Sequence, residues 1–197
     1  MQKPNGYDEA RESGTFTPVE LGGHYAVIKQ VTEMQSGTGK DMIVVLIDFD
    51  KKDKQPEYHS KAFQNNDKPD KKWPFNGSKY IVVSDYNDPS KTSRAFKTFC
   101  TSFEKSNNCS IQWGGSDWGK QFKGKKIGVV YGEEEHEYDG QTSMRRLPKW
   151  FCSWDSVADA RIPDPKYLRR PAATEAAPQN ADGFINVPED AGEEIPF

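Results

Sequence analysis

The chain has 197 residues, of which 34% are hydrophobic, and it carries a formal net charge of −3 at pH 7. Its length suits one domain with a real core plus appendages, and a mean hydropathy of −0.90 indicates that part of it is heavily solvated or unstructured. No segment approaches the roughly 18 apolar residues of a membrane span, and the N-terminal residues lack the apolar core of a secretory signal. This composition argues against a membrane protein and favours a cytoplasmic one.

The cysteines and histidines offer little for metal or redox chemistry. Cys100, Cys109 and Cys152 are odd in number and show no C-x-x-C spacing, which argues against both a disulfide framework and a zinc site. The three histidines are scattered along the chain. We therefore expect no metal and no cofactor.

The charges divide the chain near residue 170. Residues 171–197 contain six of the 30 acidic residues and none of the 27 basic ones, so the part before them has a net charge of +3. The stretch "PAATEAAPQNADG" has no periodicity and too few apolar residues to form a core. We expect a flexible arm at 1–15, a domain at 16–170 and a disordered acidic tail at 171–197. A mildly basic body with an acidic tail is typical of proteins that handle nucleic acid.

Alternating or β-branched segments bounded by turn residues predict that most of the body is β-structure. "DMIVVLIDFD" is too apolar to have one wet face, which predicts a central strand. In "EYHSKAFQ", a strand would place His59, Lys61 and Phe63 on one face. The segments predicted as strands are 23–33, 41–50, 57–64, 123–135 and 142–154, with a short extended segment at 80–86.

One helix is predicted within "DPSKTSRAFKTFCTSFEKSNN", residues 88–108. Apolar residues recur there at i, i+3, i+4 and i+7, and Asp88 or Ser90 is positioned to cap the start. These apolar residues are Phe96, Phe99, Cys100 and Phe103. Five strands, short connections and a helix before the fourth strand fit a five-stranded OB-fold-like Greek-key barrel best. A β-sandwich is the alternative.

Familiar enzyme motifs fail when their spacing is checked. "SGTGK" resembles the end of a phosphate-binding loop, but Lys40 is followed by Asp41 instead of Ser or Thr, and no helix follows. "EEEHE" lacks the second histidine of a metalloprotease motif. No Ser-His-Asp or Cys-His-Asn set suggests itself. The sequence therefore predicts a protein that is not an enzyme.

Aromatic and cationic residues instead occur together in several segments. Unpaired bases stack on aromatic rings while Lys and Arg follow the phosphates, so this pairing is typical of single-strand binding. The one predicted helix is marked by an apolar stripe, unlike the helices that read duplex DNA through Arg and Asn side chains aimed at base edges. Each tryptophan could equally be a core residue and each lysine a solvated turn residue. The candidate DNA-binding residues are His59, Lys61, Phe63, Lys71, Lys72, Trp73, Phe75, Lys79, Tyr80, Tyr86, Arg145 and Arg146.

The last residues, "EDAGEEIPF", resemble the C-terminal tip of bacterial single-stranded DNA-binding proteins, in which acidic residues precede Ile-Pro-Phe or Leu-Pro-Phe. In that family the tip docks onto replication and repair proteins. The resemblance assigns this role to the tip, with an apolar pocket of the partner holding the ring and cations receiving the carboxylates. The residues that match are Glu193, Glu194, Ile195, Pro196 and Phe197. The alternative is a tail that packs on its own body.

The body, over roughly residues 15–170, resembles small single-stranded DNA-binding OB-fold proteins of bacteriophages and mobile elements of Gram-positive bacteria. The resemblance rests on "SGTGKDMIVVLIDF", "DKPDKKWPF", "TFCTSFEKSN" and "FKGKKIGVVYGEEE". It implies a sequence-nonspecific protein that coats single-stranded DNA in phage replication or recombination, in the cytoplasm of the bacterial host. The partners expected are single-stranded DNA and replication or recombination proteins, with homo-oligomers possible and no membrane. Two alternatives remain open: an OB-like protein–protein adaptor that binds no nucleic acid, and a nuclease or other DNA enzyme.

Overall fold

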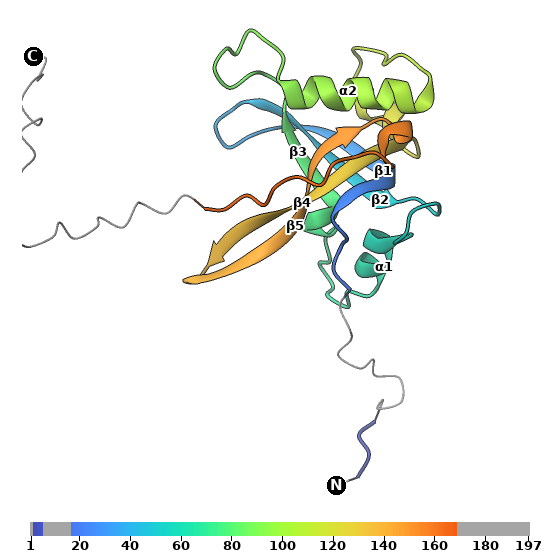
Figure 1. Cartoon of the computed structure of the whole chain (residues 1–197), viewed down its shortest axis with the longest axis vertical. Helices are drawn as coiled ribbons and strands as arrows, with labels where there is room; N and C mark the ends of the chain where they lie inside the picture. The colour runs from blue at the N-terminus through green and yellow to red at the C-terminus, as the bar shows by residue number, and fades with distance from the viewer. Residues whose placement is uncertain (1, 6–16, 169–197) are drawn as a thin grey trace, which may run out of the picture. The chain divides into compact units, whose positions relative to one another are not determined.

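The computed structural model describes residues 2–5 and 17–168 of the chain. It is mainly β, with five strands in one antiparallel sheet of order β3-β2-β1-β4-β5 (Figure 1). Within the described residues β3 and β5 do not pair, so the sheet is not closed. The expectation of a mainly β domain built on five strands is confirmed in this coarser form. The strands are β1 (Gly22–Gln35), β2 (Asp41–Phe49), β3 (Ser78–Val82), β4 (Lys126–Tyr138) and β5 (Gln141–Cys152).

Two helices accompany the sheet, α1 (Tyr58–Gln64) and α2 (Arg94–Asn107), and α2 connects β3 to β4 (Figure 1). The chain divides into two units, Met1–Lys166 and Tyr167–Phe197, and every element named here belongs to the first. The predicted tail and most of the predicted arm lie outside the described residues. Three short 3-10 turns complete the domain: η1 (Phe75–Gly77), η2 (Trp118–Phe122) and η3 (Trp154–Ser156).

A bulge in β1 decides which of its residues face the core. Alternate residues from His24 to Ile28 are buried, and the pairing with β2 is interrupted between Ile28 and Gln30. The extra residue moves Val31 onto the buried face. Strict alternation along β1 would place Val31 on the outward face together with Tyr25. Because of the bulge, Val31 instead lies in the core.

Strand β2 lies inside the sheet, between β3 and β1, as its apolar sequence predicted. Ile43, Val45 and Ile47 are buried in the core. On the other face Val44 and Leu46 are only half-buried. Burial on this second face is therefore partial, and the sheet keeps an outward surface open to solvent.

Helix α2 covers the core with its phenylalanine stripe, as predicted. The ring of Phe99 lies 5.4 Å from that of Phe122 and 5.2 Å from that of Phe151, and Phe103 lies 4.6 Å from Phe122. All four rings are almost completely buried. Aromatic packing of this kind contributes about 0.5–1.5 kcal/mol per pair beyond the buried area.

The predicted cap of α2 is wrong. The helix begins after Ser93, whose Oγ accepts a hydrogen bond from the Phe96 amide at 3.1 Å. Asp88 instead caps a turn upstream, where its carboxylate accepts from both the amide and the hydroxyl of Ser90. A serine three residues before the apolar repeat satisfies the free amides better than one six residues before it.

The segment 57–64, predicted as a strand, is the helix α1. The carboxylate of Asp48, at the end of β2, accepts hydrogen bonds from the amides of His59 (3.0 Å) and Ser60 (3.3 Å) and from the Ser60 hydroxyl. A side chain from another element thus supplies the acceptor that the first turn of a helix lacks. Alternation within "HSKAF" cannot reveal this, because the cap comes from a residue outside the segment.

Candidate nucleic-acid interface

The outward face of β1 carries a lysine that meets a tryptophan from a distant loop. Lys29 is exposed beside the bulge, and its Nζ lies 6.0 Å from the centre of the Trp73 ring. A cation at this distance from an indole face is attracted by the ring's quadrupole. The contact joins the sheet to the irregular segment between α1 and η1.

Trp73 is fixed through its polar edge. Its Nε1 donates to the carbonyl oxygens of Ile47 (3.2 Å) and Gly77 (3.1 Å), while the side chain as a whole is half-buried. A Cβ on Gly77 would lie 2.7 Å from this Nε1 and 2.8 Å from the His59 ring, so the close fit requires glycine at that position. The indole is therefore held against the sheet with part of its surface open to solvent.

Phe63 of α1 and Lys71 of the following loop extend this arrangement. The Phe63 ring lies 5.7 Å from the Trp73 ring at an interplanar angle of 36°, and the Nζ of Lys71 lies 5.1 Å from the centre of the Phe63 ring. Lys29, Phe63, Lys71 and Trp73, which we call the Trp73 platform, thus alternate charge and ring over one surface. Sequence reasoning identified three of these four residues and missed Lys29.

His59 does not belong to that surface, and its prediction as a DNA-contacting residue is corrected. It is completely buried, and its Nε2 lies 3.0 Å from the Tyr131 hydroxyl, which donates in turn to the Asn76 carbonyl at 2.5 Å. Nε2 therefore carries the proton, and Nδ1 has no partner among the described residues. Burial lowers the pKa of His59 to about 4, against a weaker opposing effect of the Asp48 charge.

Two predicted cations are half-buried: Arg146 has structural partners, and Lys79 lies where burial disfavours its charge. Arg146 is half-buried, with its guanidinium donating to Glu133 at 3.2 Å and to the Val19 carbonyl at 2.8 Å. Lys79 is half-buried as well, and burial, together with the charge of Lys149, lowers its pKa. Neither is a free phosphate contact in this arrangement.

The other predicted residues are exposed but dispersed. Tyr80, opposite Val44 in the β2–β3 pairing, lies on the outward face with half its surface free. Tyr86 is 86% exposed and has the Nζ of Lys40 at 4.8 Å from its ring centre, beside the β1–β2 turn. The remaining exposed residues are Lys61 on α1, Lys72 in the loop, Phe75 in η1 and Arg145 on β5.

A second cation–aromatic cluster was not predicted. Tyr25 and Trp154 lie 4.8 Å apart between ring centres, and the Nζ of Lys52 is 4.6 Å from the first ring and 5.9 Å from the second. Lys126 places its Nζ 5.0 Å from the Trp154 ring. We call these four residues the Tyr25 cluster. Sequence reasoning missed them because they come from four separate segments of the chain.

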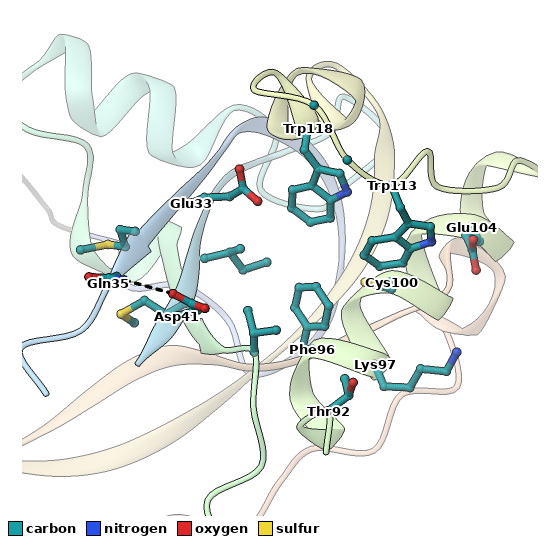
Figure 2. Close-up of a pocket in the computed structure, with 16 residues that line it drawn as sticks. Glu33, Gln35, Asp41, Thr92, Phe96, Lys97, Cys100, Glu104, Trp113 and Trp118 are labelled. Atoms are coloured by element: carbon teal, nitrogen blue, oxygen red, sulfur yellow. Dashed lines mark hydrogen bonds between the residues drawn. The ribbon is translucent and has the colours of Figure 1, made fainter. Parts of the chain in front are cut away.

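A cavity of about 910 Å³ lies elsewhere, between the β1–β2 turn and α2. Trp113, Trp118 and Phe96 gather on one side, with Gln35 and Asp41 across from them (Figure 2). The charged residues that line the cavity are Glu33, Asp41, Lys97 and Glu104. An apolar cleft whose carboxylates outnumber its lysine would repel phosphates, so we separate it from the basic surface.

Three further expectations concern partner docking, a membrane span and a metal site. The predicted docking residues 193–197 lie beyond the described part. Among residues 2–5 and 17–168 no helix is long and apolar enough to cross a membrane, and no three His, Cys, Asp or Glu side chains are grouped to hold a metal ion.

Comparison of the chain with models of known protein families and with curated proteins gives no match.

Proposed function

We propose that this protein is a sequence-nonspecific single-stranded DNA-binding protein without enzymatic activity. The observation that carries the proposal is the Trp73 platform, in which lysine ammonium groups lie 6.0 and 5.1 Å from aromatic ring centres on one surface. Bases of a single strand can stack on half-exposed rings, and the lysines beside them can pair with the phosphates. Such contacts do not depend on base identity, because every base has an aromatic face.

The strand order supports an OB-fold reading of the domain. An OB-fold is a five-stranded, partly open Greek-key barrel that binds oligonucleotides on its strand 2–3 face and adjoining loops. Here β1 is flanked by β2 and β4, β3 lies on the far side of β2, and α2 precedes β4. The Trp73 platform adjoins β2, because Trp73 donates to the carbonyl of Ile47. The two edges of the sheet also approach each other, since β5 contacts η1, the turn that leads directly into β3.

A single strand suits this surface better than a duplex. Duplex readers insert a helix or ribbon into the major groove and contact base edges. Among the described residues α2 is the only long helix, and it uses its phenylalanines to cover the core. Rings presented from a sheet and a loop require bases that are already unpaired.

One observation favours a second candidate function, a protein–protein adaptor. The cleft beside α2 combines an apolar floor with the 65% exposed Trp113, and exposed apolar surface of this kind often marks a protein-binding site. An adaptor would use this cleft and leave the Trp73 platform without a ligand. The two functions therefore make opposite predictions for DNA binding.

The context of the proposed function follows from the resemblances noted in the sequence. We propose a phage or prophage protein that acts in DNA replication or recombination in the host cytoplasm. Residues Glu193–Phe197 would recruit partner proteins through the apolar tip and its acidic neighbours. No cofactor is required, and self-association remains compatible with the proposal.

Titration of the full chain with fluorescent oligo-dT tests the proposal. We expect binding that weakens with salt, and a duplex of equal length that binds less tightly. An adaptor would bind neither at any salt concentration. Binding of the duplex with affinity equal to that of the single strand would contradict a stacking mode.

A further inference from the structure

A hollow of about 400 Å³ lies beside the Tyr25 cluster, on the domain's outward side. It is formed by the start of β1, the turn after β2 and the segment that follows η3. The ring of Tyr25 and the side chains of Lys52 and Lys54 line it, and Gly22 and Gly23 contribute backbone. An aromatic ring, two lysines and open space are the components that a nucleotide needs.

The rings next to this hollow are held in place by backbone hydrogen bonds. The Tyr25 amide donates to Asp53 Oδ2 at 2.8 Å, and its carbonyl accepts from the Asp50 amide at 2.8 Å. The Trp154 amide donates to the Ser106 hydroxyl at 2.9 Å, which ties η3 to α2. Both rings are thereby positioned before any ligand arrives, which reduces the entropy lost on binding.

Two acidic residues near the hollow, Asp53 and Glu20, are engaged with other residues. Asp53 accepts hydrogen bonds from the His24 ring at 3.0 Å and from the amides of Tyr25 and Gln55 at 2.8 and 2.9 Å. Glu20 is paired with Lys54 at 2.6 Å. The ammonium groups of Lys52 and Lys126 contact only ring faces among the contacts resolved for them. They are the cations that remain available for phosphate.

Strand β1 connects the Tyr25 cluster to the Trp73 platform. Tyr25 and Lys29 are four residues apart on the outward side of the strand, which corresponds to about 13 Å. Between them Val27 faces outward and is paired directly with Lys126 of β4. A polynucleotide lying along β1 would meet the Tyr25 cluster at one end, including Lys126 beside Val27, and the Trp73 platform at the other.

We propose that the Tyr25 cluster and its hollow form a second nucleotide-binding subsite, which holds the same single strand as the Trp73 platform. One base stacks against Tyr25 or Trp154, and Lys52 and Lys126 pair with its flanking phosphates. The strand therefore runs along the outward face of β1, across the β1–β4 pair, and does not end at the platform. This inference rests on the proposed function.

The double variant Lys52→Ala with Lys126→Ala tests the subsite, because both side chains are exposed and their removal leaves the core intact. Affinity is measured for two lengths of oligo-dT. One, of about 20 nucleotides, exceeds the range of about 4–16 nucleotides bound per OB-fold, and the other, of about 5, lies near the lower end of that range. For the longer oligonucleotide we expect at least a tenfold loss at low salt and a salt slope reduced by about two. For the shorter one, which the platform alone can hold, we expect a change below about twofold.

Two further variants complete the design. Lys52→Arg with Lys126→Arg keeps both charges and should retain the wild-type salt slope. Lys97→Ala removes a lysine that lines the cavity beside α2 and should have no effect. Wild-type binding of the longer oligonucleotide by the Lys52→Ala, Lys126→Ala variant would overturn the second subsite and leave the proposed function standing. Absence of binding by the wild-type protein at both lengths would overturn the proposed function itself.

Discussion

The ammonium group of Lys29 on β1 lies 6.0 Å from the ring centre of Trp73, a residue 44 positions later in the sequence. This contact turns an otherwise irregular loop into part of the sheet's outward surface. Because the indole is also anchored to the backbone of β2 at Ile47, loop and sheet present one surface to a ligand.

Removing the two lysines of the platform should weaken binding through lost phosphate pairing. We expect the double variant Lys29→Ala, Lys71→Ala to bind single-stranded DNA less tightly and to lower the salt slope by up to about two. The measurement is a fluorescence titration at several salt concentrations between about 50 and 200 mM. Lys97→Ala is the matched control, and an unchanged slope in the double variant would show that these lysines are merely solvated.

Loss of the Trp73 ring should cost stacking energy without a change in charge. We expect Trp73→Leu to lose about 1–3 kcal/mol of binding free energy and to keep the wild-type salt slope, because the lysines remain. Trp73→Phe retains a ring but loses both hydrogen bonds of Nε1, so its affinity should lie between those of the wild type and Trp73→Leu. Equal affinities for all three proteins would mean that no base stacks there.

Gly77→Ala tests how the indole is positioned. The added Cβ would lie within 3 Å of both Trp73 and His59, so we expect a lower melting temperature together with weaker single-strand binding. The control is Gly37→Ala, a position in the β1–β2 turn where a Cβ meets nothing within 4 Å. An unchanged melting temperature for Gly77→Ala would contradict the close packing described here.

The buried His59 should make the folded state sensitive to acid. Its pKa is about 4 in the folded protein and about 6.5 when unfolded, so the unfolded state binds more protons between these values. The free energy of unfolding should therefore fall by about 3 kcal/mol from this residue as the pH drops from about 6.5 to about 4, and then level off. His59→Gln retains a donor for Tyr131 but cannot titrate, so denaturant unfolding of this variant should show a flatter dependence over that window. An identical pH dependence of the two proteins would contradict the assignment.

Truncation after Arg170 should raise affinity for single-stranded DNA at low ionic strength. It removes six acidic residues and no basic ones, which changes the net charge from −3 to +3 and lessens repulsion of the phosphates. Deletion of Ile195, Pro196 and Phe197 alone leaves these side-chain charges in place, so DNA binding should change little while capture of partner proteins is lost. A lower melting temperature after the three-residue deletion would instead indicate that the tip packs on its own domain.

The mainly β class, the helix α2 and most of the strands could be predicted because their signals are local. The i, i+3, i+4, i+7 stripe of α2 and the β-branched run of β2 need no information from elsewhere in the chain. Asp139 and Gly140, with φ of 51° and 70°, form a two-residue turn between β4 and β5, and an Asp-Gly pair is itself a strong local signal for such a turn. Local chemistry decides these elements.

The incorrect or missing predictions occur where a residue from another part of the chain determines the local structure. Asp48 caps α1 from β2, so a helix stands where alternation favoured a strand. His59 looked like an interface residue among Lys61 and Phe63, but its hydrogen bond to Tyr131, 72 residues away, places it in the core. Tyr25 and Trp154 meet only once the sheet has formed. No pattern within a single segment contains this information.

The most direct test of the central claim combines single-strand binding with tryptophan fluorescence. The full chain is titrated with oligo-dT, with a duplex of the same length and with the corresponding RNA, at low and at high salt. We predict quenching of tryptophan emission by the single strand, weaker binding at high salt and a clear preference for single strands over the duplex. Equal binding of the duplex, or single-strand binding without quenching and without salt dependence, would contradict the account.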